Sequence, residues 1–543
     1  MVRRNLVASA LLALTVSAPA LGQTPQTEKS RTDDLVKQAV ERYTSGIEAA
    51  SARRAQDAQG APSVALTLDD AVRRATDNNL EMVIERLNPR TFDLTLAGLR
   101  ATYHPVATSR YGRNDNLNAP TNLLNQGVFN NSIMTYNAGL TRNMEWGGGS
   151  LITNFNNQQR VSADPNSNFN PQFSNSYSLN FTQPLLRGFR IDQTRQQMRT
   201  TAISRDNAEL NVRARTTNTL AAVRSAYWDY VFSIQAVDVA RQSLALASKL
   251  LSDNKIRVEV GTMAPMDVVQ AEAEEATRQQ TLTTSTATMA TAELSLKRLI
   301  VSGTSDPLWS QHIDPVDRPD FESVSIDLEG AVRTALQQRT DLQVARNQME
   351  TSNVQLKFLN DEKLPEIDAN IVYGATGIGG TQYLFEGTGF DRVRTGEIPG
   401  GYGDALRTLA GRDYPNWTAQ IIVNYPLGGS QASAQAARQR LLIQQNQAQI
   451  RATELQVATE VTNAALQVTN NTEGLTAARA ARDLSQRRLD AEMSRFEVGM
   501  SNNYQVVQAQ RDLREAQNSE LRALLNYRKS LVEFDRVQQA GAR

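Results

Sequence analysis

Very few side chains of this chain could do chemistry. Its 543 residues include no Cys and two His, His104 and His312. The absence of Cys excludes thiolate metal sites, Cys nucleophiles and a disulfide scaffold, and two separate His leave little for metal or triad chemistry. We therefore expect structural roles for both His, and neither a metal nor a cofactor.

Glu366 and Asp368 could form a pair of carboxylates for hydrolysis. A spacing of two would place both on one face of a strand. They alternate with Ile367 and Ala369, and this alternation favours a strand with one polar face. The sequence also lacks a phosphate-binding loop of the GxxxxGK[ST] type. A secreted enzyme is therefore not expected.

A repeated motif is the most informative stretch of the sequence. Residues 257–271 and 495–509 share Arg, then Glu-Val-Gly, then Val-Val-Gln-Ala, at a constant offset of 238. In each copy a helical run ends, the chain turns at Gly261 or Gly499, and a second helical run begins. Glycine in a left-handed conformation commonly ends helices in this way. The two motifs therefore predict the tips of two helical hairpins.

A second pair of motifs supports an internal duplication. Residues 68–75 resemble residues 328–335 at an offset of 260, and the same offset relates Pro105 to Pro365. Self-similarity at fixed spacing indicates a repeated structural unit. We expect the chain to be built from two similar halves.

The helical runs are unusually long. Residues 191–260 contain neither Gly nor Pro, and residues 430–498 are interrupted only by Gly474. Each run therefore predicts a helix of about 100 Å. The shorter runs, stacked end to end in pairs, would cover about the same length; they are residues 68–103, 266–301, 328–360 and 503–540. Apolar residues spaced three and four apart predict coiled-coil packing, as in Val237, Ala240, Leu244, Ala247 and Leu251, and in Val506, Ala509, Leu513 and Ala516.

Between the helices the sequence alternates like β-strands. Apolar or aromatic residues occupy every second position in 134–146, 151–155, 177–182, 367–373 and 417–425, and loops rich in Asn, Gly and Ser are expected near 114–132, 162–174 and 375–415. This pattern fits either a transmembrane β-barrel or a soluble sandwich. The long helices favour the barrel, which several chains must complete because open strand edges are untenable in lipid.

The N-terminus predicts export. Residues 1–22 combine Arg3 and Arg4, an apolar run and small residues, which is typical of a signal peptide. The alternative, a membrane anchor, needs about 20 apolar residues, and no later segment approaches that length. The 57 basic and 57 acidic residues balance, so no nucleic-acid-binding surface is expected.

Together these features resemble the TolC family of bacterial outer-membrane efflux channels. The resemblance covers about residues 64–540 and depends on the duplicated helix starts, the two Val-Gly tips and the strand exits at Gln183-Pro184-Leu185 and Tyr425-Pro426-Leu427. It implies a mainly α chain with a β-barrel part: long antiparallel coiled-coil helices form a periplasmic tunnel, and 4–6 strands per protomer join a shared trimeric barrel of 12–18 strands. The expected parts are a signal peptide (1–22), an extension and linker (23–63), and two structural repeats (64–325 and 326–543). An equatorial region would include about 301–325, with 32–60 as a further candidate.

The resemblance also implies partners. The chain would form a homotrimer in the outer membrane, in contact with its lipid, as the passive exit duct of a tripartite efflux or type I secretion system. An inner-membrane pump would drive it through a periplasmic adaptor. The implied adaptor-docking residues at the tips are Val260, Gly261, Thr262, Val498, Gly499 and Met500.

The implied gate of the tunnel differs from that of the best-known members. Asp267 matches an acidic position at the tip, although at a helix start it could serve the helix dipole alone. Gln505 and Gln508 stand where those members carry paired Asp residues, and Phe496 stands where a Tyr hydroxyl would link neighbouring helices. The constriction would then be polar but neutral. A different class of protein, an exported structural or adhesive coiled coil with a β head, remains the alternative.

Overall fold

The chain divides into two units in the computed structural model. The smaller unit contains most of β1 (Ser63–Leu66) and β6 (His312–Pro315), which pair with each other. The larger unit, Leu66–Trp309 with Pro315–Arg543, contains the long helices and the large sheet. The expected signal peptide, the extension up to residue 62 and the tip residue Thr262 lie outside the described residues. The structure describes residues 63–118, 129–162, 167–261, 264–318, 324–387, 392–428 and 430–539.

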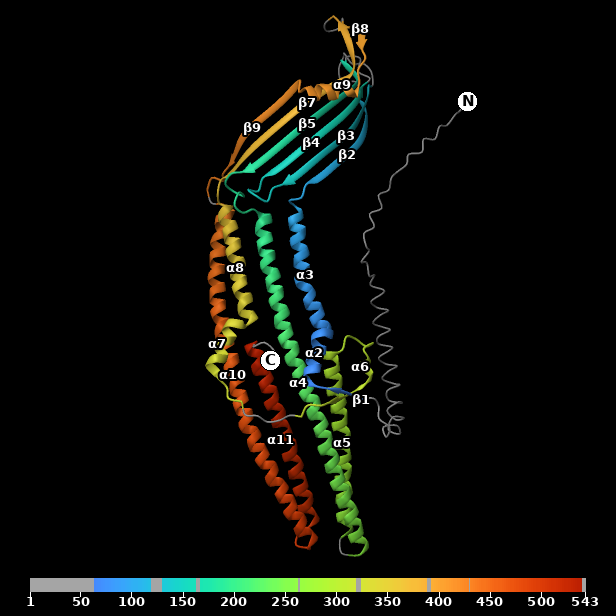
Figure 1. Cartoon of the computed structure of the whole chain (residues 1–543), viewed down its shortest axis with the longest axis vertical. Coiled ribbons are helices and arrows are strands. Elements are labelled where there is room, and N and C mark those ends of the chain that lie inside the picture. Colours follow the sequence, from blue (N-terminus) through green and yellow to red (C-terminus); the bar gives the residue numbers. More distant parts are fainter. Residues whose placement is uncertain are drawn as a thin grey trace, which may run out of the picture. The chain divides into compact units, whose positions relative to one another are not determined.

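Two long helical hairpins form the lower part of this unit in Figure 1. α4 (Gln193–Glu259) and α10 (Gln431–Glu497) each contain 67 residues, a length of about 100 Å. Each turns back into a helix of 36 residues, α5 (Pro265–Ile300) or α11 (Asn503–Gln538). The expected pairing of a long helix with a shorter antiparallel one is confirmed.

Two shorter helices precede the strands in each half. They are α2 (Leu68–Asn78) and α3 (Leu80–Ala101), then α7 (Leu328–Gln338) and α8 (Thr340–Asp361), and the four-residue helix α6 (Pro307–Ser310) lies between the halves. The expectation of one continuous run in each half was wrong, because the chain is extended at Asn79 and Arg339. Asn79 holds its break: its side chain accepts a hydrogen bond from Met82 N–H at 3.1 Å and donates to Leu299 O at 3.0 Å.

The upper helices form a wall in the order α3, α4, α8, α10, each packed on the next (Figure 1). Small side chains also allow α7 to pack closely on α10: Ala331 and Ala335 of α7 lie with Val457, Val461 and Ala464 of α10 in one buried cluster. The predicted coiled-coil stripes are also core. Those buried are Val237, Ala240, Ala247, Leu251, Val506, Ala509 and Leu513. Among the residues described, no helix has the length and hydropathy required to cross a bilayer.

The strands form one antiparallel sheet in the order β2-β3-β4-β5-β7-β9, and β8 extends the far end of β7. The hairpin turn at Gly147 and Gly148, which both have positive φ, joins β3 to β4 within this sheet. The bounds are β2 (Val106–Asn118), β3 (Phe129–Asn143), β4 (Ser150–Ser162), β5 (Phe169–Pro184), β7 (Glu366–Glu386), β8 (Val393–Ile398) and β9 (Tyr414–Asn424).

One face of the sheet is apolar and the other polar. Opposite partners share a face, so the register places Phe181 beside Ile371, Ile371 beside Ala419, and Tyr373 beside Trp417 on the apolar face. On the polar face Asn370 donates to Asn180 and Thr182, each at 3.0 Å. Glu366 and Asp368 also lie on the polar face, and Glu366 pairs with Arg187 at 3.1 Å. The alternation predicted from the sequence is confirmed.

The region 375–415 was expected to be a loop, and this expectation was wrong. β7 continues to Glu386, and β8 and a helix, α9 (Tyr402–Gly411), follow it. Four glycines between positions 374 and 380 give the stretch a loop-like composition. Two of them, Gly377 and Gly379, lie against the backbone of α9.

Candidate functional site: the hairpin tips

Both tips turn at a glycine, as the repeated motif predicts. α4 ends at Glu259, and Gly261 follows with φ of 76°; α10 ends at Glu497, and Gly499 follows with φ of 78°. Other residues rarely adopt this conformation. Gly261 N–H donates to Val258 O at 3.0 Å, and Met500 N–H donates to Arg495 O at 2.8 Å. The sequence therefore determines the turn locally in both hairpins.

The tips present apolar side chains to solvent. Val498 is 70% exposed and Met500 is 78% exposed, and Val260 and Met266 of the other tip are similarly exposed. A Cβ atom on Gly261 or Gly499 would meet no atom of the described residues within 4 Å. Each tip therefore exposes apolar side chains and leaves open space around its glycine.

Phe496, a gate candidate, lies in the core just above the second tip. It is buried with Leu250, Val506 and Val507. The Arg257 guanidinium stacks over its ring at 4.4 Å from the centroid. This contact joins α10 to α4, so Phe496 holds the two hairpins of one chain together.

The other gate candidates lie in the first turns of the return helices. Asp267 is half-buried in the first turn of α5, where a carboxylate favours the helix dipole. Gln505 is exposed, and its N–H donates to the N-cap side chain of Asn502 at 3.0 Å. Gln508 donates to Asp512 Oδ1 at 2.8 Å, and Asp512 also pairs with Arg488 at 2.8 Å. Asp512 thus places an acidic side chain one helical turn beyond the neutral residues Gln505 and Gln508.

A buried ionic cluster, which the sequence reasoning missed, joins the hairpins above the tips. The Glu274 side chain on α5 is 5% exposed and accepts hydrogen bonds from Arg278 of α5 and from Arg511 of α11, the latter at 3.2 Å to Nε. The hydrogen bond that Arg511 donates to the Glu274 carboxylate raises the pKa of Arg511. The (i, i+4) pair was visible in the sequence, but Arg511 lies 237 residues away.

A second buried contact lies closer to the tips. Asn254 of α4 donates to Asn503 of α11 at 3.1 Å, and both residues are buried. A buried Asn pair in a coiled coil fixes the register of the helices. Phe496, the Glu274 cluster and this pair therefore fix the two hairpins of the chain against each other.

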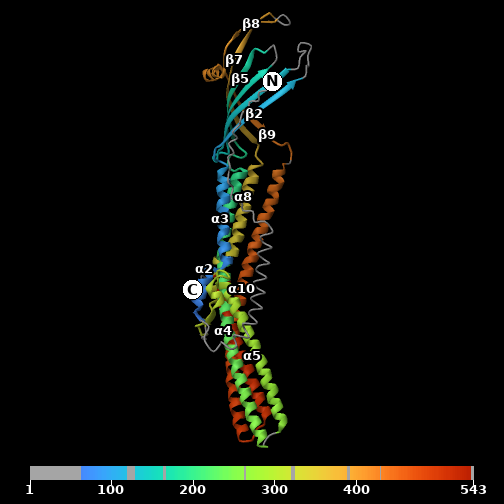
Figure 2. The ribbon, with the colours of Figure 1, turned by 90° about the vertical axis from the view of Figure 1, so that its right-hand side faces the viewer.

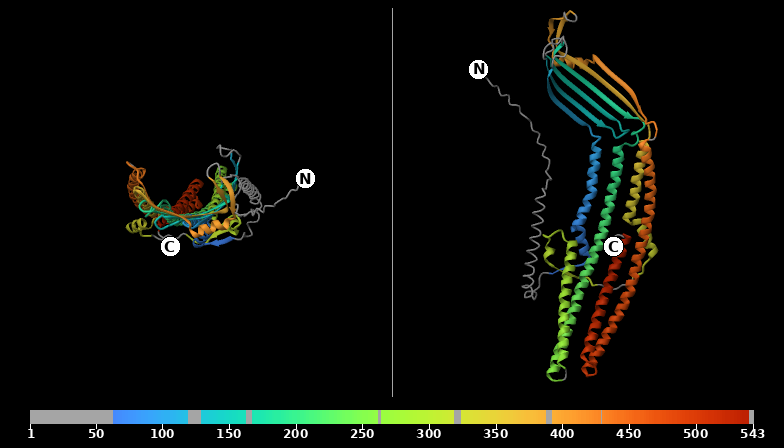
Figure 3. Two further views of the ribbon diagram at one scale, coloured as in Figure 1. Left: turned by 90° about the horizontal axis from the view of Figure 1, so that it is seen from above. Right: turned by 180° about the vertical axis from the view of Figure 1, so that it is seen from behind.

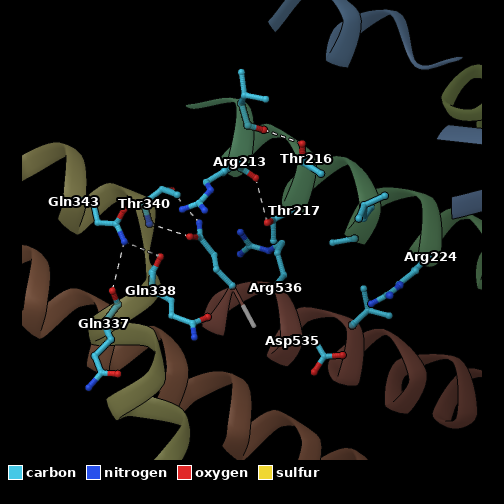
Figure 4. A pocket seen from close by; sticks show the side chains of 15 residues that line it. Arg213, Thr216, Thr217, Arg224, Gln337, Gln338, Thr340, Gln343, Asp535 and Arg536 are labelled. Carbon is cyan, nitrogen blue, oxygen red and sulfur yellow. Dashed lines mark hydrogen bonds between the residues drawn. The ribbon is translucent and has the colours of Figure 1, made fainter. Parts of the chain in front are cut away.

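A cavity of about 510 Å³ opens at mid-length, where α8 begins and α11 ends (Figure 4). Arg213, Arg224, Asp535 and Arg536 line it, together with glutamines of α7 and α8. Burial raises the pKa of Asp535, and the charge of Arg224 opposes this shift. In the described part of the chain, no group of three or more His, Asp or Glu side chains could hold a metal ion.

Comparison with known proteins identifies a family whose model matches most of the chain. A family model described as outer membrane efflux protein matches residues 152–301 and 331–537. No curated protein sequence matches the chain.

Solved structures also resemble this fold, among them the following three. A membrane protein from Pseudomonas aeruginosa is 15% identical with a TM-score of 0.63, and the match covers 87% of this chain and 93% of that one. The Campylobacter jejuni CmeC outer membrane channel is 13% identical with a TM-score of 0.61, covering 88% and 87%. The open state of the Neisseria gonorrhoeae MtrE outer membrane channel is 14% identical with a TM-score of 0.59, covering 87% and 89%.

Proposed function

The chain belongs to the outer membrane efflux protein family, and from this premise we propose that three copies form one channel-tunnel whose hairpin tips dock a periplasmic adaptor. As a member of this family it is an outer-membrane efflux channel and a non-enzymatic transport protein. The proposal adds the number of copies, the docking surface and the partners. Family membership also removes the alternative of an adhesive or structural coiled coil.

The edges of the helical wall support self-assembly. α3 and α10 lie at its two ends in Figure 1 and carry exposed apolar side chains, which elsewhere in the wall are covered by a neighbouring helix. Those on α3 are Leu80, Val83, Ile84, Leu87 and Leu94, and those on α10 are Leu441, Leu455, Leu466 and Leu484.

The internal duplication indicates how these edges meet. The offset of 238 relates α4 to α10, and the offset of 260 relates α3 to α8. Because α4 packs against α8 and α11 within the chain, α10 of one copy would pack in the same way against α3 and α5 of the next. Leu455 and Leu80 correspond to Thr217 and Thr340, which line the same cavity. The two leucines would therefore meet across the junction between copies.

The two edge strands of the sheet also require a neighbouring copy. Its outer strands are β2 and β9, which run in opposite directions, so β9 of one copy could pair antiparallel with β2 of the next. Unpaired edges are untenable in lipid. Without β8, which pairs only with the far end of β7, each copy has six strands in the sheet. Three copies would then close a barrel of about 18 strands, within the range of known outer-membrane barrels.

The open apolar tips are the observation that carries the docking assignment. Val260, Val498 and Met500 are exposed although burial of such side chains would stabilise the chain. An adaptor with a complementary apolar hairpin would cover them. The motive force for export would come from an inner-membrane pump bound through that adaptor.

Two measurements test this proposal. Trimers extracted in detergent should conduct ions when inserted into planar bilayers, and the absence of conductance would contradict the channel. After crosslinking in cells, an adaptor and a pump should co-purify with the chain through the tips. Crosslinks confined to other surfaces would contradict the docking assignment.

A further inference from the structure

α9 packs on the convex face of the sheet. Figure 3 (left) shows the sheet as a crescent with α9 on its outer side, and Figure 2 shows α9 apart from the concave side. The Tyr402 ring lies 5.8 Å from that of Tyr136 and 5.9 Å from that of Phe173. Its hydroxyl donates to Asn157 Oδ1 at 3.0 Å.

Glycines in β7 make this position specific. A Cβ atom on Gly377 would overlap the carbonyl oxygen of Ala405, and one on Gly379 would overlap the Ala405 amide nitrogen. The backbone of α9 therefore lies directly on the backbone of β7, which only glycine permits. The loop-like composition of this stretch of β7 thus encodes a docking platform for a helix.

The face beneath α9 is the apolar one. Asn157, Asn175 and Gly377 lie opposite one another on adjacent strands and so share this face. Nearer the helical wall, the same face carries Tyr177, Tyr373 and Ile371. Trp417 on this face is 75% exposed, and Tyr111 and Ile421 are also exposed. In a membrane barrel the apolar face meets lipid and the polar face meets water. α9 therefore lies outside the barrel wall and not in the channel.

Its level in the membrane follows from the strand length. From Ile367, at the end of β7 nearest the helical wall, to Gly377 a tilted strand rises about 25 Å, the height of the apolar band of a membrane barrel. The helical wall is periplasmic, so α9 lies at the opposite, extracellular border of this band. Head groups of the outer leaflet occupy that level.

The exposed edge of α9 carries two guanidinium groups. The Arg407 side chain is 83% exposed and pairs with Asp404 at 3.1 Å; such an exposed pair contributes little. Arg412, also exposed, ends the helix in a left-handed conformation with φ of 55°. Guanidinium groups bind phosphate in bidentate fashion.

We propose that α9 is a lipid-contacting collar on the outside of the barrel, in which Arg407 and Arg412 bind the phosphate groups of outer-leaflet lipid. The inference rests on the proposed function, because it requires the curved sheets to close around a shared channel. It assigns to α9 a surface that faces the membrane and takes no part in export through the lumen.

The lack of Cys allows a clean test of the position. Single spin labels would be placed by Ala410→Cys on the exposed edge of α9, by Ile421→Cys in the apolar band and by Asn154→Cys on the concave face. In vesicles of outer-membrane lipid, relaxation by oxygen reports lipid and relaxation by a nickel chelate reports water. We expect the Ala410 label to lie between the other two, closer to Ile421. A label as accessible to nickel as the one at Asn154 would overturn the collar.

The phosphate contact has a separate test. Native mass spectrometry would count phosphorylated lipids retained by trimers of wild type, Arg407→Gln with Arg412→Gln, and Arg110→Gln, which alters the concave face. Retention should fall about fivefold for each guanidinium removed from α9, as expected for a basic group at an anionic lipid surface. Unchanged retention in the double variant would overturn the contact.

Conductance of the same wild-type preparation separates the two proposals. Absent conductance would contradict the channel itself. Normal conductance with a water-exposed Ala410 label would contradict the collar alone.

Discussion

Gln539 and Thr340 exchange two hydrogen bonds across the point where one helix ends and another begins. Thr340 N–H donates to Gln539 Oε1 at 2.8 Å, and Gln539 Nε2 donates to Thr340 Oγ1 at 3.0 Å. Since α11 ends at Gln538 and α8 begins at Thr340, this pair joins the two short helices end to end beside α4. Asn79 makes the corresponding joint between α5 and α3.

Gln539→Leu should weaken this joint. The Thr340 N–H would lose its acceptor at a helix start, and the free energy of unfolding should fall by about 1–3 kcal/mol. Thermal unfolding of the purified protein would measure the effect. Gln538→Leu is the matched control, because the Gln538 amide donates to Phe534 O of its own helix. Equal effects of the two substitutions would contradict a specific role for the joint.

Glu274→Gln should loosen the entrance. The substitution removes the carboxylate that Arg278 and Arg511 share. Breaking a buried ion pair in this way lowers the free energy of unfolding by about 3–5 kcal/mol. The two hairpins should separate more readily, so single-channel conductance should rise. Glu275→Gln, beside it, is the control, since Glu275 accepts from Ser248 at 2.6 Å outside the cluster. A conductance unchanged from wild type would show that the cluster does not hold the hairpins closed.

Bulky substitution of Gly261 and Gly499 should abolish adaptor-dependent export and leave trimers intact. The new side chain would meet open space, and the left-handed backbone would cost about 1–2 kcal/mol at each site. Export assays and adaptor co-purification would measure the effect. The control is the same residue at Gly474, on the surface of α10, where a Cβ also meets no described atom within 4 Å. Normal export by the tip variant would refute the docking assignment.

Leu455→Glu and Leu80→Lys should each prevent assembly. Either change places an unpaired charge in the proposed junction between copies, at a cost of about 3–5 kcal/mol. Analytical ultracentrifugation in detergent should show monomers for each single variant. The double variant should recover trimers, because the two charges would face each other. Failure of this rescue, with both single variants still folded, would argue against the junction inferred from the duplication.

The raised pKa of Asp535 predicts that the stability of the protein depends on pH. Because its pKa in the folded chain is raised above 3.8, mainly by burial, its contribution is fully present below that value and is lost as the pH rises through the folded pKa. Asp535→Asn should therefore raise the thermal unfolding temperature at neutral pH relative to wild type. The difference should vanish below pH 3.8. Parallel curves at every pH would contradict the raised pKa.

The sequence was sufficient for features with short-range causes. Helix length follows from runs without Gly or Pro, the tip turns follow from glycine's access to positive φ, and the two faces of the sheet follow from alternation along each strand. The family resemblance followed because these local signals recur in order in both halves. The family model matches residues 152–301 and 331–537, which include both Val-Gly tips and both strand exits.

Tertiary structure alone decided the contacts between distant segments. Glu274 meets Arg511 across 237 residues, and Gln539 meets Thr340 across 199; no local pattern selects those partners. The sequence did not predict α9, because its position also depends on a contact with a distant segment. The glycines of β7 look like loop residues until the helix backbone that needs them lies against the strand. Local propensity determined the elements, whereas close packing between distant backbones decided where charges pair, where helices join and which face α9 covers.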